Sequence, residues 1–275
     1  MKLDSLVQEL KNRPTRPRIG LALAGGAARG LAHIGVLQVL EEVKLPVDLI
    51  VGTSAGAIVG SLWASGMSAQ KMHRIARATE WWFLAKPVVF GTGLLHSHGI
   101  ESWLDRIFPV DKFADLPIQF IATATDFRTG ELVVLDTGDV THAVRISCTV
   151  PGVYQAVEYQ GRALVDGGLV QNLPAQVARA FGAEILIAVD LHSDVLEHET
   201  PQTVLVSLIH SANILQRQQE LAQLRLVDLV VQPKVGEFSA VSFKSVDQFV
   251  ERGRVAAQAK LEELTSLLGK VVGGN

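Results

Sequence analysis

The sequence predicts an α/β protein with a mostly parallel central sheet that helices cover on both faces. Seven short apolar runs have the character of strands, at residues 18–25, 47–53, 118–125, 131–136, 162–167, 184–191 and 228–233. Helical patterns separate several of them, at 30–43, 55–65, 172–181 and 245–269. Short unbroken apolar runs that alternate with helices are typical of strands buried in a parallel sheet. The sequence TDFRTGE between the third and fourth runs indicates a hairpin, so we expect the sheet to be mixed.

The 275 residues carry no internal repeat and no linker rich in proline, glycine or serine, so one domain over 18–270 is the simplest organisation. Residues 1–17 form an N-terminal helix and linker in this interpretation. Leu3, Leu6, Val7 and Leu10 recur there at helical spacing, and basic residues follow. A short helix packed on the domain is favoured over a weak membrane-surface element.

Composition excludes several classes of protein. The net charge is only −3 and both signs are mixed along the chain, so no nucleic-acid partner is expected. The single cysteine excludes a disulfide framework, and no metal-ligand spacing stands out. No run is long and apolar enough for a membrane span, and the N-terminus lacks the core of a signal peptide. We therefore expect a cytoplasmic protein, with peripheral membrane contact as an open alternative.

Two segments look irregular in sequence. Residues 67–99 hold Trp81, Trp82, Phe83 and Pro87, and could either cap a pocket for an acyl chain or form a structural insertion. Residues 192–203 are polar and broken by Pro201, which predicts a loop.

The first candidate motif is GTSAG, from Gly52 to Gly56, between a predicted strand and a predicted helix. A nucleophile elbow requires this context, because the serine takes a strained turn and the glycines let strand and helix approach. Ser54 is therefore the candidate nucleophile.

The second motif, GGAARG, connects the first strand to a helix and includes Gly25, Gly26, Ala27, Arg29 and Gly30. Such a turn exposes backbone N–H groups that can bind an anion or a developing oxyanion. A dinucleotide-binding turn is disfavoured, since the middle glycine is replaced by alanine and no acid ends the second strand. A phosphate-binding loop of the G-K-[ST] type is absent.

The third motif is LVDGG, in which Asp166, Gly167 and Gly168 follow a strand. Asp-Gly is first of all a turn signal. At the end of a strand, however, the Asp166 carboxylate could face Ser54, and that would explain why no histidine lies near the serine in sequence.

Other side chains leave alternatives open. Asp190 and His192 also follow a strand, so a triad containing histidine stays possible. A structural or surface role is favoured for His33, His96, His98 and His142. Cys148 is better explained as a buried cysteine than as a reactive thiol.

Taken together and in this order, GGAARG, GTSAG, RISCTVPGVY and VDGG resemble the patatin-like phospholipase family, particularly its compact bacterial branch. The likeness runs over about residues 17–265. It implies a three-layer α/β/α domain and a Ser–Asp dyad made of Ser54 and Asp166. It also implies an oxyanion hole around Gly25, Gly26 and Ala27, with Arg29 matching the basic residue of that turn. Ala27 stands where glycine is commoner in the family.

The resemblance implies a serine acyl hydrolase that cleaves lipid carboxyl esters and needs no cofactor. A carboxylate of ordinary pKa is a poor general base, so we expect burial to raise the pKa of Asp166. The alternative function is a regulatory or lipid-binding protein that keeps the fold with little turnover. Acyl length, headgroup, positional preference and oligomeric state are not readable from the sequence.

Overall fold

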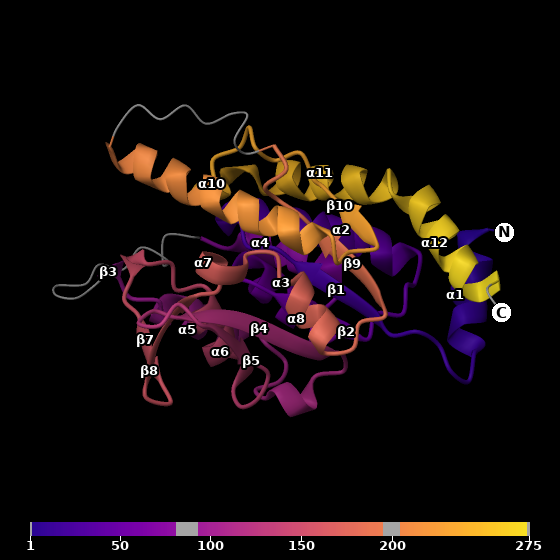
Figure 1. Cartoon of the computed structure of the whole chain (residues 1–275), viewed down its shortest axis with the longest axis horizontal. Coiled ribbons are helices and arrows are strands. Elements are labelled where there is room, and N and C mark those ends of the chain that lie inside the picture. The colour runs from indigo at the N-terminus through magenta and orange to yellow at the C-terminus, as the bar shows by residue number, and fades with distance from the viewer. Residues whose placement is uncertain (1, 81–92, 195–203, 274–275) are drawn as a thin grey trace.

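The computed structural model describes residues 2–80, 93–194 and 204–273 (Figure 1). Its centre is a sheet of eight strands in which β10, β9, β1, β2 and β4 run parallel to one another. β5 and β8 pair with β4 in the antiparallel sense, and β7 pairs antiparallel with β8. The expectation of a mixed, mostly parallel sheet is therefore confirmed.

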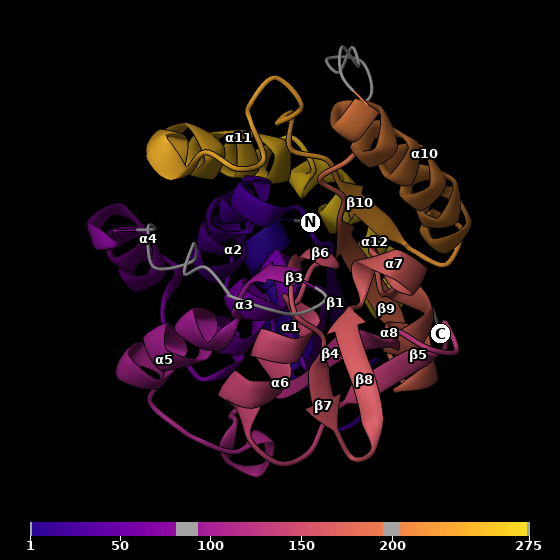
Figure 2. The same cartoon turned by 90° about the vertical axis from the view of Figure 1, so that its left-hand side faces the viewer.

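The strands agree closely with the seven predicted runs. Their bounds are β1 Ile19–Leu23, β2 Leu49–Gly52, β4 Gln119–Asp126, β5 Leu132–Leu135, β8 Arg162–Asp166, β9 Ile185–Val189 and β10 Leu229–Val231. Three short strands were not predicted: β3 Gly93–Leu95, β6 Gly152–Tyr154 and β7 Val157–Tyr159. β3 and β6 form a separate parallel pair beside the main sheet (Figure 2).

Helices cover both faces of the sheet, so the structure has the expected three layers (Figures 1 and 2). On one face the core contains residues of α2 (Ala32–Glu42), α3 (Ala55–Ala64), α4 (Ala69–Ala78), α5 (His98–Ile107), α6 (Val140–Ser147) and α11 (Val246–Gln258). On the other face a second cluster joins α8 (Ala175–Ala180) to the end of α10 (Val204–Leu224).

Alternation along β1 explains why both faces are apolar. Leu21 and Leu23 belong to the larger cluster and Ala22 to the smaller one, because successive side chains of a strand point to opposite faces. All three are fully buried. An uninterrupted apolar run is therefore what a strand covered on both sides requires.

The N-terminal helix α1 (Leu3–Asn12) packs against the C-terminal helix α12 (Leu261–Gly273). Its apolar residues Leu6, Val7 and Leu10 are buried in the larger cluster, so the protein itself covers the face that could have met a membrane. Within the described residues, no helix is both long and apolar enough to span a bilayer.

Several expectations for the helices are corrected. Residues 67–99 are not irregular throughout, because they include α4 and the start of α5, and the long helix α10 was not predicted at all. The single helix expected at 245–269 is two helices, α11 and α12. The helix expected at 172–181 is α8 alone, preceded by the single turn of α7 (Gly168–Gln171). Trp81, Trp82, Phe83, Pro87 and residues 195–203 lie outside the described residues.

Candidate active site

Ser54 occupies the turn between β2 and α3, as the GTSAG motif predicted. Its backbone angles, φ 53° and ψ −121°, are sparsely populated for a residue with a side chain. The turn is held from outside, because Ser54 N–H donates to Ser147 Oγ at 2.9 Å. A Cβ at Gly56 would lie 2.3 Å from Leu23 O, so only glycine lets α3 begin this close to β1.

Asp166 is the last residue of β8, and its carboxylate lies near the Ser54 hydroxyl, which favours the ionised carboxylate as a hydrogen-bond donor. The carboxylate is buried, with 6% of the residue exposed, and Oδ1 also accepts the Gly168 N–H at 2.7 Å. Burial raises the pKa of Asp166 to about 6, while the hydrogen bonds from Ser54 and Gly168 act in the opposite direction. The raised pKa is what the sequence analysis expected of a carboxylate able to serve as a base near neutral pH.

The two residues meet because two strands end against each other. Ala122 of β4 pairs with Gly52 of β2 on one side and with β5 on the other. Ala124 pairs with Asp166 of β8 and also with β5. β2 and β8 therefore lie on the same edge of β4 and approach each other from opposite ends. β8 is thus one of the antiparallel strands of the mostly parallel sheet.

The glycine-rich turn lies beside Ser54, but two of its backbone N–H groups are already used. Gly25 N–H donates to Asn172 O at 3.2 Å, and Arg29 N–H donates to Gly26 O at 3.0 Å. Within the described residues, neither Gly26 N–H nor Ala27 N–H has a hydrogen-bond acceptor. Those two N–H groups are therefore available to a ligand in this part of the site. Ala27 has a φ of 48°, in the left-handed region that glycine adopts more readily than alanine.

The Arg29 guanidinium binds backbone oxygens of a neighbouring segment. It is buried, with 5% of the residue exposed, and its guanidinium donates to Phe238 O at 3.1 Å and to Gly236 O at 3.4 Å. The turn also receives a bond from a neighbouring segment, because Ala28 N–H donates to Ala240 O. Arg29 thus joins the glycine-rich turn to residues 236–240.

Histidines considered as alternatives have other partners. His192 Nδ1 lies 2.7 Å from Glu220 Oε1, and Asp190 accepts hydrogen bonds from Arg217 and Gln232. His33 is fully buried and Nε2 contacts Ala24 O at 2.8 Å; burial lowers its pKa to about 4. His142 Nδ1 lies 3.0 Å from Glu101 Oε1. Within the described residues, no hydrogen bond joins any of these three imidazoles to Ser54.

Three neighbours of the site were missed in sequence. Ser147 and Cys148 end helix α6, and Cys148 is buried near Ser54 and Asp166. Burial and the nearby Asp166 charge raise the pKa of the Cys148 thiol, which agrees with a buried rather than a reactive cysteine. Asn172 contacts the glycine-rich turn. The segment RISCTVPG was noted for its likeness to the family, and no local signal in it pointed to Ser54.

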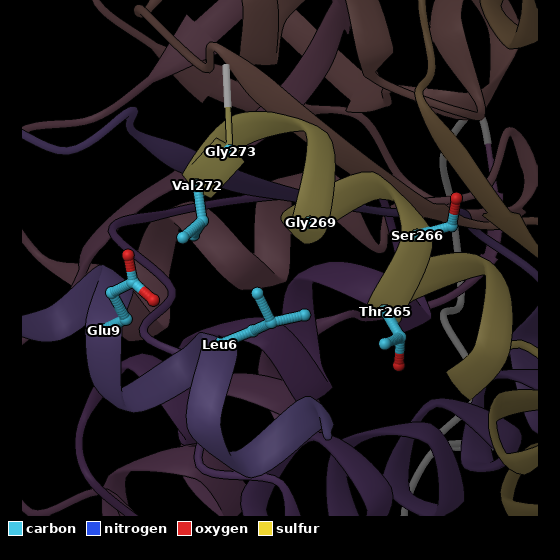
Figure 3. Close-up of a pocket in the computed structure, with 7 residues that line it drawn as sticks. All are labelled: Leu6, Glu9, Thr265, Ser266, Gly269, Val272 and Gly273. Atoms are coloured by element: carbon cyan, nitrogen blue, oxygen red, sulfur yellow. The ribbon is translucent and has the colours of Figure 1, made fainter. Parts of the chain in front are cut away.

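A pocket of about 450 Å³ lies between α1 and α12 (Figure 3). In Figure 1, α1 and α12 lie at the right-hand end of the molecule and β3 lies toward the left-hand end. Glu9 is the only ionisable side chain among the described residues that line it. Thr265 Oγ1 in this pocket donates its proton to Leu261 O of its own helix.

Within the described residues, no group of three or more histidine, cysteine, aspartate or glutamate side chains is arranged to hold a metal ion.

Sequence comparison identifies relatives of the chain. An uncharacterized NTE family protein of Mycobacterium tuberculosis is 32% identical over 280 residues, which cover 91% of this chain and 47% of the relative. Human patatin-like phospholipase domain-containing protein 6 is 36% identical over 185 residues, which cover 64% of this chain and 13% of the relative. The chain thus spans about half the length, or less, of these curated relatives.

Solved structures share the fold at low sequence identity. VipD from Legionella pneumophila superposes with a TM-score of 0.66 at 14% identity, covering 90% of this chain and 67% of VipD. Human GIVD cytosolic phospholipase A2, solved in complex with methyl gamma-linolenyl fluorophosphonate, gives a TM-score of 0.57 at 11% identity and covers 99% of this chain and 62% of that chain. The family described as patatin-like phospholipase matches residues 21–179, more than half of the sequence, and includes all three motifs. The chain therefore belongs to the patatin-like phospholipase family.

Proposed function

We propose that this protein hydrolyses carboxyl esters of lipids through a Ser54–Asp166 dyad. The observation that carries the proposal is that a serine on a strained strand-to-helix turn lies next to a buried carboxylate whose pKa is raised by burial to about 6. Family membership supports a lipid ester as the substrate class.

The first step is acylation. Asp166 accepts the hydroxyl proton of Ser54 while Oγ attacks the ester carbonyl carbon. The carbonyl oxygen gains negative charge and accepts hydrogen bonds from the free N–H groups of Gly26 and Ala27. When the intermediate collapses, the bond from carbon to the leaving oxygen breaks and Asp166 returns the proton to the departing alcohol.

The second step is hydrolysis of the acyl-enzyme. Asp166 removes a proton from water, and the resulting hydroxide attacks the same carbonyl carbon. The oxyanion forms again beside Gly26 and Ala27, and Ser54 leaves with the proton that Asp166 held. The fatty acid and the free enzyme are the products, so the cycle balances without a cofactor.

Labelling by a fluorophosphonate tests the nucleophile directly, because the phosphorus atom reacts with an activated serine. We expect labelling of the wild type and none of Ser54→Ala. Ser65→Ala is the matched control, since Ser65 is a buried serine at the end of the same helix and donates to Leu62 O. Asp166→Asn should lose labelling and turnover of 4-nitrophenyl esters together.

Two results would contradict the proposal. Equal labelling of the wild type and Ser54→Ala would place the nucleophile elsewhere. A folded wild type that neither reacts with the probe nor cleaves short or long acyl esters would favour the alternative of a regulatory or lipid-binding protein.

A further inference from the structure

Asn172 is a buried residue that follows α7 and contacts the glycine-rich turn twice. Its backbone oxygen accepts the Gly25 N–H at 3.2 Å, and its side-chain Nδ2 lies 3.4 Å from Gly25 O. Both polar groups of Gly25 are thus directed toward one asparagine. No step of the proposed reaction uses this residue.

The contact with Gly25 O bears on the oxyanion donors because of peptide geometry. The Gly25 oxygen and the Gly26 N–H belong to the same planar peptide, and in a trans peptide they point in opposite directions. A hydrogen bond that holds the Gly25 oxygen therefore fixes the direction of the Gly26 N–H. A peptide between two glycines has few steric restraints of its own, so an external contact is needed.

The Asn172 amide is itself held by helix α10. Nδ2 lies 2.6 Å from Glu220 Oε1 and 3.0 Å from His192 Nδ1. A carboxylate oxygen accepts, and His192 Nδ1 also lies 2.7 Å from Glu220 Oε1, so a proton on this nitrogen is donated to the carboxylate. One Asn172 N–H then bonds Glu220, and the other is left for Gly25 O.

Glu220 also decides which way the amide faces. With its oxygen and nitrogen exchanged, Asn172 would bring an oxygen within 2.6 Å of the carboxylate, which is repulsive. Glu220 is 1% exposed and pairs with Arg217 at 3.4 Å, so it is fixed in turn. The orientation of the amide follows from these buried partners.

Close packing shows that Asn172 separates the two halves of the site. A Cβ at Gly25 would lie 2.4 Å from Asn172 Oδ1 and 3.2 Å from Ser54 Cβ. A Cβ at Gly168 would lie 2.9 Å from the same Oδ1 and 3.0 Å from Asp166 Oδ1. The amide therefore sits between the turn that carries the donors and the turn that follows the base.

We infer that Asn172 is a positioning residue for the oxyanion hole, which holds the Gly25–Gly26 peptide so that the Gly26 N–H faces the reacting carbonyl. The inference rests on the proposed function. Glu220 of α10 anchors Asn172 and makes the helix part of the device.

Thionoesters provide a readout that a purely structural role would not move. Sulfur accepts hydrogen bonds more weakly than oxygen, so an intact oxyanion hole favours 4-nitrophenyl butyrate over its thionoester. In Asn172→Ala we expect kcat/KM for the oxygen ester to fall about 10- to 100-fold while the thionoester rate changes much less. The ratio of the oxygen-ester rate to the thionoester rate should fall by a similar factor. Rates are normalised to sites titrated with the fluorophosphonate.

Further variants separate folding from positioning. Asn172→Asp keeps the volume and removes the donor to Gly25 O, but places a carboxylate beside Glu220. The double variant Asn172→Asp/Glu220→Gln relieves that repulsion and still lacks the donor, so it should fold and show the lowered ratio. Gln219→Ala, an exposed change on the same helix, should leave both rates unchanged.

The outcomes distinguish the inference from the proposed function. A wild type without esterase activity or probe labelling contradicts the proposed function. The inference is wrong if the wild type is active and the hydrolysis of both esters slows by the same factor in folded Asn172→Ala. Where the alanine variant does not fold, the double variant gives the same test. A ratio that falls in either variant supports it.

Discussion

Gly52 and Asp166 end two strands that meet head to head along one edge of β4, opposite Ala122 and Ala124 respectively. Thr123, the residue between those two, joins the junction through a hydrogen bond of 2.6 Å between its Oγ1 and that of Thr53. The serine that follows β2 and the carboxylate that ends β8 are thereby brought to the same level of the sheet. This junction, more than the individual loops, builds the candidate site.

Backbone strain at Ser54 predicts that removing the side chain altogether stabilises the fold. Glycine adopts a positive φ without a Cβ clash, whereas the Cβ of alanine still clashes. Ser54→Gly should therefore be more stable than Ser54→Ala by about 1 kcal/mol. Urea denaturation of the two inactive variants measures the difference. A glycine variant less stable than the alanine variant would show that the turn is not strained.

The raised pKa of Asp166 predicts the pH dependence of activity. The base must be ionised to accept the Ser54 proton, so kcat/KM should rise as the pH increases through about 6 and reach a plateau above it. Rates of ester hydrolysis between pH 4.5 and 8.5, within the range where the protein stays folded, test this dependence. A profile that is flat across pH 6 would mean that the rate-limiting proton transfer does not involve Asp166.

The same shift predicts how stability changes with pH. Because the pKa of Asp166 is higher in the folded protein than in the unfolded chain, this residue contributes stability that is fully present below about pH 4 and lost as the pH rises through 6. Asp166→Asn, which cannot ionise, should gain on the order of 3 kcal/mol relative to the wild type between these limits. Asp247→Asn, at a largely exposed carboxylate, is the control and should not show this gain.

The buried thiol of Cys148 should react slowly with a disulfide reagent in the native state. Burial raises its pKa and lowers the thiolate fraction, so the reaction at pH 8 should be about tenfold or more slower than in the unfolded chain. The chain has one cysteine, so the released chromophore reports this site alone. Equal rates in the native and unfolded states would show that the thiol is accessible.

Arg29 is predicted to stabilise the fold by satisfying buried carbonyls. Arg29→Ala leaves Phe238 O and Gly236 O without their guanidinium donor and should lower the free energy of unfolding by about 2 kcal/mol. Arg29→Lys should not restore it, because a single ammonium cannot reproduce the planar fork of donors. Arg77→Ala, on the surface, should change it by less than about 0.5 kcal/mol.

Local patterns were enough to predict the elements that carry the chemistry. The apolar runs that became β1, β2, β8 and β9 are buried in the sheet or end at the site, and their periodicity is visible over a few residues. The strand, turn and helix around Ser54 follow the same rule, because glycine spacing and apolar burial act within one short segment.

Elements that depend on distant partners were missed. Helix α10 buries Glu220 and joins the site through hydrogen bonds to Asn172 and His192. Because these polar contacts attach it, an apolar stripe did not predict the helix. The three-residue strands β3, β6 and β7 are too short for alternation to show. The break between α11 and α12 interrupts an amphipathic pattern that continues through it.

The sequence by itself determined the α/β class, the order of the strands along the chain and the three loops that carry the candidate motifs. Only the tertiary structure decided that β8 runs back toward β2 along the same edge of β4, and that Gly25 and Arg29 use their N–H groups for internal bonds. The physical reason is that strand pairing and donor satisfaction depend on residues far apart in the chain. Periodicity and glycine spacing report only on neighbours.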